Sequence, residues 1–194
     1  ELEHAPLADY IYKEVEYRDD KYPTTTVKGV GFKRPYFEVS GACPGCGETP
    51  YYRLATQLFG SDMMIANATG CSSIYSGSTP STPFTTDKNG QGPAWCNSLF
   101  EDNAEFGFGM KLAQDANRAA LKNKLDEILA STDNADVKAA IDEYYATYED
   151  GEANAKATDK LVAALEACGC DKAQEILKEK EFLSKKSQWI FGGD

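Results

Sequence analysis

The chain has 194 residues, of which 42% are hydrophobic, and its 20 basic against 31 acidic residues give a formal net charge of −11. This length suits one globular domain with a full core, or one domain that carries a sizeable insertion. The acidic excess argues against nucleic acid or an anionic membrane as the main partner, because each needs a basic face. No membrane-span window or signal-peptide pattern is found, so we expect a cytoplasmic protein.

The first 38 residues are punctuated by prolines and are interpreted as an irregular lead-in. Apolar and polar residues alternate from Lys33 to Ser40, which predicts a first strand. His4 is the only histidine in the chain, and it lies in this lead-in. A catalytic histidine or a Cys–His nucleophile pair is therefore not expected.

A cysteine turn, Cys43-Pro44-Gly45-Cys46, follows the lead-in. Thr49-Pro50 then predicts a helix start, and apolar residues at helical spacing continue to Gly60. The apolar run Met63–Ala68 predicts a buried strand that enters a second cysteine turn. The order of strand, turn, helix, strand and turn is typical of an α/β sheet, in which ligands gather at the carboxyl ends of the strands.

The thiols of these two turns are candidate metal ligands. Cys43 and Cys46 have CxxC spacing, and Cys71 lies 25 residues beyond Cys46. Six cysteines are too sparse for a disulfide scaffold. Three thiolates from two loops favour a metal over a disulfide or a redox dithiol. On spacing alone an iron–sulfur cluster and structural zinc both remain open, and unrelated buried thiols are a weaker alternative.

The other cysteines receive structural interpretations. Cys96 has no companion in the sequence and is expected to be a small packed side chain. Cys168 and Cys170 flank Gly169 at a predicted helix end, so we expect exposed thiols beside a glycine C-cap. A CxC pair can also bind metal, and that alternative stays open.

The second half of the chain changes character. Residues 76–109 are rich in Gly, Ser, Thr and Pro and predict a long loop. Helical spacing then predicts helices at about 110–130, 135–148, 153–168 and 171–184. A strand is expected at 188–191, followed by Gly192-Gly193-Asp194, so we expect the sequence to be part of a longer polypeptide.

Three stretches carry a family resemblance. GACPGCGETPYYRLATQLFG at 41–60, MMIANATGCSSIYSGSTPSTPFTT at 63–86 and GQGPAWCNSLFEDNAEFGFGM at 90–110 resemble, in order and spacing, the thiamine-diphosphate domain of pyruvate:ferredoxin (flavodoxin) oxidoreductases. The likeness resumes at QWIFGGD, residues 188–194. One departure is Pro44, where the single-chain enzymes usually have alanine, whereas proline is commoner in the split-subunit relatives that act on other 2-oxoacids. The flanking motifs still favour the pyruvate enzyme.

The resemblance implies a set of site residues. Cys43, Cys46 and Cys71 would ligate a [4Fe-4S] cluster, whose fourth cysteine lies downstream in the family. Glu48, Cys71 and Ile74 would line the thiamine diphosphate pocket. Gly193 and Asp194 resemble the start of a Gly-Asp-Gly motif, in which the aspartate binds the Mg²⁺ that holds the diphosphate. No catalytic side chain is assigned, because the family draws those residues from other domains.

The resemblance also implies an architecture and an activity. The fold class would be α/β, an incomplete thiamine-diphosphate-binding fold with a parallel sheet flanked by helices. Its bounds would be a lead-in at 1–38, the cofactor domain at 39–110 and 187–194, and a helical insertion at 111–186.

The family oxidises pyruvate with coenzyme A to acetyl-CoA and carbon dioxide, and passes electrons through [4Fe-4S] clusters to ferredoxin or flavodoxin. The complete enzyme would be a homodimer. This chain alone is expected to be inactive without the remaining domains. A non-catalytic thiolate metal-binding or electron-transfer module is the alternative.

Overall fold

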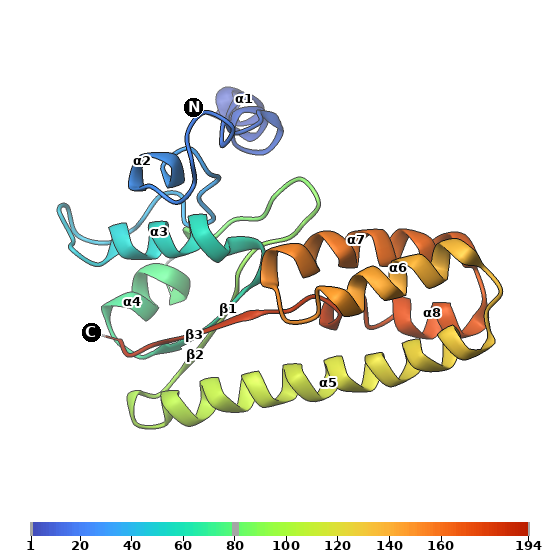
Figure 1. The fold of residues 1–194 in the computed structure, drawn as a ribbon. Helices are drawn as coiled ribbons and strands as arrows, with labels where there is room; N and C mark the ends of the chain where they lie inside the picture. Colours follow the sequence, from blue (N-terminus) through green and yellow to red (C-terminus); the bar gives the residue numbers. More distant parts are fainter. Residues whose placement is uncertain (1, 79–81, 194) are drawn as a thin grey trace. The chain divides into compact units, whose positions relative to one another are not determined.

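The computed structural model describes residues 2–78 and 82–193, which form two compact units (Figure 1). The sheet unit comprises residues 2–78, 82–106 and 189–193, and the helical unit comprises residues 107–188. The mixed α/β fold class predicted from the sequence is confirmed. The domain bounds inferred from the family resemblance stay a prediction.

The sheet has three strands in the order β2-β1-β3, with bounds Met63–Ala68 for β1, Ala94–Ser98 for β2 and Ser187–Phe191 for β3. β1 and β2 pair in parallel, with Met64 opposite Ala94 and Ala68 opposite Ser98. Five of the six β1 residues are buried, as expected for a central strand whose sequence is a nearly continuous apolar run. The predicted strands at 63–68 and 188–191 are confirmed.

The N-terminal segment differs from the predicted irregular lead-in. It begins with a 3-10 turn at Leu2–His4, α1 at Ala5–Asp9 and a π-helical turn at Tyr10–Glu14. α2 follows at Val27–Val30, where the side chain of Thr26 accepts a hydrogen bond from the backbone of Gly29. Pro6 lies in the first turn of α1, where a missing N–H costs little, so this proline starts a helix rather than preventing one.

The strand expected from Lys33 to Ser40 is wrong. Only one antiparallel bridge forms there, between Phe37 and Phe84. The Thr56 hydroxyl accepts both the Tyr36 and the Phe37 backbone N–H, at 3.2 and 3.1 Å. Because a helix side chain takes two adjacent amides, they cannot both join a strand ladder, and Phe37 is left as a buried anchor.

The long loop predicted for 76–109 is also partly wrong, since it contains β2 and the first residues of α5 (Asn103–Ser131). β2 is largely exposed and reads Ala-Trp-Cys-Asn-Ser, so it lacks the apolar run that marks a buried strand. Its second residue, Trp95, instead packs against Gly77, where a Cβ would come within 2.4 Å of the indole ring. Tertiary packing therefore fixes this strand.

α3 (Thr49–Phe59) supplies the core of the sheet unit together with α4 (Cys71–Ser73) and the π-helical turn Ile74–Ser78. Phe37, Tyr52 and Tyr75 form a buried aromatic cluster, and Phe84 and Phe191 pack against it. The Tyr52 and Phe191 ring centroids are 4.5 Å apart, which ties α3 to β3. The predicted helix at 49–60 is confirmed.

The helical unit is built from α5, α6 (Ala135–Ala146), α7 (Gly151–Cys168) and α8 (Asp171–Leu177). Asn134 and Asp150 cap α6 and α7 with their side chains. α8 is shorter than the predicted 171–184, because the chain turns into a 3-10 segment at Lys180–Phe182. Apolar side chains line one shared core that includes Leu125, Ile141, Tyr144, Leu161, Leu165 and Ile176.

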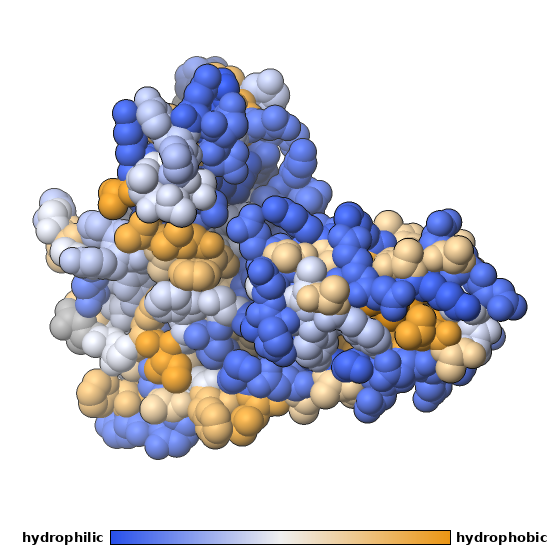
Figure 2. Space-filling model, in the orientation of Figure 1, coloured by the Kyte–Doolittle hydropathy of each residue, from blue (hydrophilic) through white to orange (hydrophobic). Residues whose placement is uncertain are grey.

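The visible face of the helical unit is mainly hydrophilic (Figure 2). Exposed lysine–carboxylate pairs such as Lys156–Glu152 and Lys160–Glu143 lie on this unit. Such pairs contribute about 0–1 kcal/mol each, so the buried core carries the stability of the unit. No helix in the described residues is long and apolar enough to cross a membrane.

Candidate cofactor site

The Cys43–Cys46 segment is a tight β-turn. The Cys46 N–H donates to the Cys43 carbonyl at 3.0 Å, and Gly45 has φ +77°. Proline followed by a glycine with positive φ is the pattern of a type II turn, so Pro44 fits the local geometry. Cys43 is exposed and Cys46 is half-buried, which leaves both thiols at the surface of the sheet unit.

Cys71 follows β1 through the turn Thr69-Gly70 and is the first residue of α4. The Ser73 hydroxyl accepts from the Gly70 N–H at 3.0 Å and donates to the Gly70 carbonyl at 2.7 Å, which fixes this turn. Cys71 is exposed, and Ile74 is 53% exposed. Both side chains therefore lie on the outer surface at the carboxyl end of the central strand.

A buried polar network supports the Cys71 turn. Asn67, at the end of β1, is completely buried. Its amide donates to the Ala68 carbonyl at 2.7 Å and to the Ser72 hydroxyl at 3.0 Å, and its oxygen accepts from the Tyr52 hydroxyl and the Trp95 indole, each at 3.4 Å. Asn67 thus joins β1, α3, β2 and α4. Asn67-Ala68-Thr69 also matches the N-glycosylation pattern, but the buried Asn67 side chain has a structural role instead.

Glu48 is connected to the same region. It immediately precedes α3, and its carboxylate accepts a hydrogen bond from the Tyr75 hydroxyl at 2.9 Å. Burial and this hydrogen bond raise the pKa of Tyr75, which keeps its hydroxyl protonated as a donor. The pair links the segment that carries Cys46 to the helical turn that follows Cys71.

Gly193 approaches the end of β1 from β3. Its φ is +75°, and a Cβ built on it would lie 3.0 Å from the Ala68 carbonyl oxygen and 3.1 Å from that of Thr69. Only glycine adopts this conformation at this separation without strain. The predicted diphosphate-motif glycine therefore lies against the residues that lead into Cys71, whereas the predicted Mg²⁺ ligand Asp194 lies outside the described residues.

The structure links the environments of Glu48, Cys71 and Gly193 through these contacts. Across residues 2–78 and 82–193, it gathers no group of three or more His, Cys, Asp and Glu side chains that could hold a metal ion. The ligand set Cys43, Cys46 and Cys71 therefore stays a prediction. Tyr75 and Asn67 were not predicted from the sequence, and an asparagine inside the apolar run Met63–Ala68 was the one available signal.

The remaining cysteines are also placed. Cys96 lies on β2 and is exposed, so the expectation of a packed side chain is wrong. β2 is largely exposed along its length, which explains the difference. The expectation for the CxC pair is confirmed in its main part, because Gly169 is the left-handed C-cap of α7 and Cys170 is exposed, although Cys168 is half-buried.

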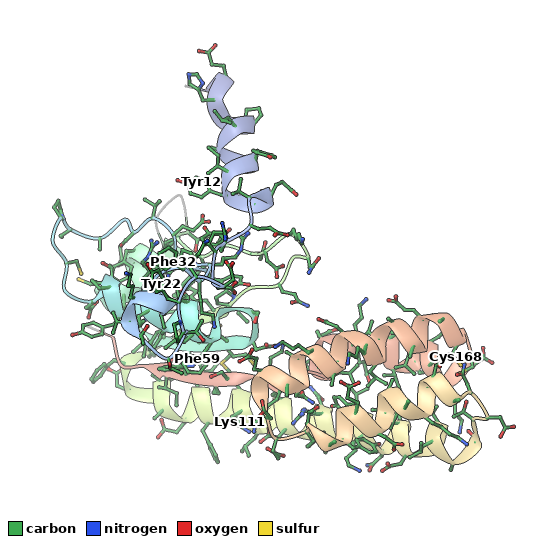
Figure 3. All side chains as sticks on the ribbon, turned by 45° about the horizontal axis from the view of Figure 1, so that its top comes forward. Tyr12, Tyr22, Phe32, Phe59, Lys111 and Cys168 are labelled. Atoms are coloured by element: carbon green, nitrogen blue, oxygen red, sulfur yellow. The ribbon has the colours of Figure 1, made fainter. Side chains whose placement is uncertain are left out.

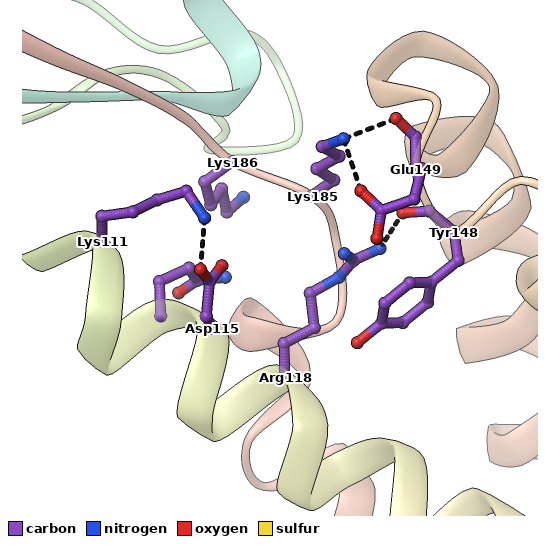
Figure 4. Close-up of a pocket in the computed structure, with 8 residues that line it drawn as sticks. Lys111, Asp115, Arg118, Tyr148, Glu149, Lys185 and Lys186 are labelled. Carbon is purple, nitrogen blue, oxygen red and sulfur yellow. Dashed lines mark hydrogen bonds and ion pairs between the residues drawn. The ribbon is translucent and has the colours of Figure 1, made fainter.

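A polar hollow of about 270 Å³ lies within the helical unit (Figure 4). Its cations are engaged by neighbouring groups: Lys111 pairs with Asp115, and Lys185 pairs with Glu149 at 2.8 Å. Arg118 is 5% exposed and donates to three acceptors, the carbonyls of Leu183 and Tyr148 and the side chain of Asn154. These contacts give the hollow a structural role, as a clamp that holds the segment after α6 and the segment before β3.

Gly193 and the turn that leads into Cys71 meet at the carboxyl end of the central strand, which is where α/β enzymes typically bind their ligands. No protein-family model matches the chain. The chain is 45% identical over 192 residues to the pyruvate-flavodoxin oxidoreductase of Klebsiella pneumoniae, covering 98% of this chain and 16% of that protein.

Two further relatives agree. The pyruvate:ferredoxin oxidoreductase of Moorella thermoacetica is 48% identical over 87% of this chain, and the probable pyruvate-flavodoxin oxidoreductase of Escherichia coli is 50% identical over 82%. The chain spans 15% and 13% of their lengths. It therefore belongs to the pyruvate-flavodoxin and pyruvate:ferredoxin oxidoreductases, of which it represents one segment.

Proposed function

We propose that the sheet unit is the thiamine diphosphate and [4Fe-4S] part of a cytoplasmic enzyme that converts pyruvate and coenzyme A to acetyl-CoA and carbon dioxide. The electrons would pass to ferredoxin or flavodoxin. The observation that carries this proposal is the 45% identity over 192 residues to a pyruvate-flavodoxin oxidoreductase. We also propose that the complete enzyme is a homodimer and that its other domains supply the residues that bind the substrate.

Cys43, Cys46 and Cys71 are the proposed cluster ligands. Thiolates are the donors that [4Fe-4S] clusters take, and such a cluster uses four. Their exposed or half-buried positions leave the sulfurs accessible to a cluster at the surface of the unit. This chain would supply three thiolates, and the fourth would come from elsewhere in the enzyme.

Glu48, Cys71, Ile74, Gly193 and Asp194 are the proposed thiamine diphosphate and Mg²⁺ residues. When bound, thiamine diphosphate supplies the electron sink that decarboxylation of a 2-oxoacid requires. The glycine at 193 lets the backbone approach Thr69 closely, which suits a turn that must pass near a diphosphate. The hydrogen bond from Tyr75 fixes the Glu48 carboxylate, so this acceptor is oriented before any cofactor binds.

The ligand assignment is tested in the native protein that contains this sequence, purified without oxygen. Cys43→Ser and Cys71→Ser should each lower the iron and acid-labile sulfide content, because each removes a thiolate from the cluster. Cys96→Ser is the matched control, since Cys96 is also exposed and lies in the same unit. Unchanged iron in Cys71→Ser would reject the assignment, and zinc without iron would support the non-catalytic module instead.

A further inference from the structure

The pair Cys168 and Cys170 lies in the connection between α7 and α8, at one end of the helical unit (Figure 3). The two sulfur atoms are 3.1 Å apart, with the Cys168 thiol donating to the Cys170 sulfur. A disulfide bond is about 2.05 Å long, so the sulfurs need to approach by about 1 Å to become bonded. No other pair of thiols is recorded in such contact among the described residues.

The backbone holds the two thiols in this arrangement. Gly169 adopts the left-handed conformation at φ +61° and donates its N–H to the Leu165 carbonyl at 3.3 Å, which ends α7. Cys170 then precedes α8, and its carbonyl accepts from the Gln174 N–H at 3.0 Å. Because each cysteine is anchored to its own helix, the reversal at Gly169 brings the side chains together.

The two thiols differ in acidity. The hydrogen bond from Cys168 and the backbone N–H of Ala173 lower the pKa of Cys170, against an opposing effect of the Asp171 charge. The same sulfur–sulfur hydrogen bond raises the pKa of Cys168. Cys170 is also the exposed member of the pair, so it is the better attacking thiolate and Cys168 the better resolving thiol.

We propose that Cys168 and Cys170 form a reactive dithiol that closes to an intramolecular disulfide by exchange with a small-molecule disulfide of the glutathione type. The Cys170 thiolate attacks one sulfur of that disulfide, forms a mixed disulfide and releases one small thiolate. Cys168 then loses its proton to water and attacks the Cys170 sulfur, which releases the second small thiolate. The dithiol is oxidised, and the small disulfide is reduced to two thiols.

A metal site explains the pair less well. Structural zinc uses four protein ligands, whereas this pair offers two thiols, and residues 2–78 and 82–193 contain no group of three or more His, Cys, Asp or Glu side chains that could hold a metal ion. Two carboxylates of this unit are engaged by lysines, Glu127 by Lys172 and Glu166 by Lys180. Exchange chemistry needs only the two sulfurs and access from solvent.

The test uses the 194-residue chain equilibrated with oxidised and reduced glutathione, trapped with a thiol alkylating agent and analysed by peptide mass spectrometry. The peptide that contains both cysteines should lose two hydrogens and escape alkylation. Cys168→Ser should trap one glutathione on Cys170, whereas Cys170→Ser should react several-fold more slowly at Cys168. Because Cys43 and Cys46 lie in a different peptide, the peptide masses distinguish a disulfide of this pair from one between Cys43 and Cys46.

Cys96→Ser provides the control, because it removes an exposed cysteine from the other unit and should leave closure unchanged. Circular dichroism of each variant verifies that the helices are retained. The proposal would be overturned if both cysteines stayed fully alkylated in oxidised glutathione, or if each carried its own glutathione instead of closing the ring.

Discussion

At the scale of single residues, the candidate site depends on two positions whose side chains could not be replaced without loss, one for lack of space and one for its hydrogen bonds. Gly193 is the clearest case, because its φ is positive and a Cβ built on it would lie 3.0 Å from the Ala68 carbonyl oxygen, so both features select glycine. Asn67 is the second, because one buried amide serves four partners. Both residues contact the chain between β1 and α4, which carries Cys71.

Gly193→Ala should destabilise the sheet unit by about 1–2 kcal/mol, since a non-glycine residue in the left-handed region costs that amount before any contact is counted. Urea unfolding measures the change. Gly192→Ala is the matched control, because a Cβ at Gly192 meets no atom within 4 Å and its φ is not positive. Equal stability of the two variants would contradict the packing described for Gly193.

Asn67→Ala should cost about 2–4 kcal/mol, because it leaves the buried Tyr52 and Ser72 hydroxyls with lost partners. The comparison is Asn97→Ala on β2, which removes an exposed hydrogen bond to Thr69 and should change stability by about 0.5 kcal/mol or less. Chemical denaturation followed by tryptophan fluorescence reports both. A loss in Asn67→Ala no larger than in Asn97→Ala would show that the network does not support the turn.

At the scale of elements, the helical unit depends on a few buried polar contacts inside an apolar core. Arg118→Met should destabilise this unit by about 2–4 kcal/mol, because the guanidinium satisfies the Leu183 and Tyr148 carbonyls and stacks 3.6 Å from the Tyr148 ring centroid. Lys156→Met, which removes the exposed pair with Glu152, should change stability by at most about 1 kcal/mol. Thermal unfolding distinguishes the two, and similar losses would reject the clamp.

The helical unit should also lose stability at alkaline pH. Burial raises the pKa of Tyr144 to about 12, and its hydroxyl donates to the Leu183 carbonyl at 2.8 Å. The unfolded tyrosine titrates near a pKa of about 10, so the stabilisation is complete below that pH and is lost as pH rises toward about 12. Tyr144→Phe should flatten this decline in urea unfolding, whereas exposed Tyr10→Phe should not. An unchanged pH slope in Tyr144→Phe would contradict the assignment.

Elements with a local signal were predictable from the sequence, and elements fixed by distant contacts were not. The apolar run of β1 and the Pro and Gly boundaries of α3 identified both elements with nearly correct bounds. The segment around Phe37 alternates like a strand, but the hydroxyl of Thr56, 19 residues away, takes its amide. β2 was missed for the converse reason, since its exposed residues carry no burial pattern and its register comes from β1.

The candidate site residues Cys43, Cys46, Cys71 and Gly193 came from cysteine spacing and the family resemblance, and their roles stay a prediction. The contacts that support this region could not be predicted from the sequence. The contact between Tyr75 and Glu48 joins residues 27 apart, and no sequence period connects them. Such contacts depend on how α3 and α4 pack against β1, which is why the sequence alone did not identify Tyr75.

At the scale of the whole molecule, a sheet unit with two cysteine turns and a helical unit match one segment of a family of long oxidoreductases. The proposed activity requires that electrons from pyruvate reach a cluster held by this segment. The native protein should therefore show broad visible absorption from iron and sulfide when it is purified without oxygen. That absorption provides a direct readout of the cluster's redox state.

The most direct measurement is the visible spectrum of this native protein before and after anaerobic addition of pyruvate and coenzyme A. We predict that pyruvate bleaches the cluster absorption, and that the bleaching is lost in Cys71→Ser and retained in Cys96→Ser. An iron-containing spectrum that pyruvate leaves unchanged, or a protein that contains zinc and no iron, would contradict the account.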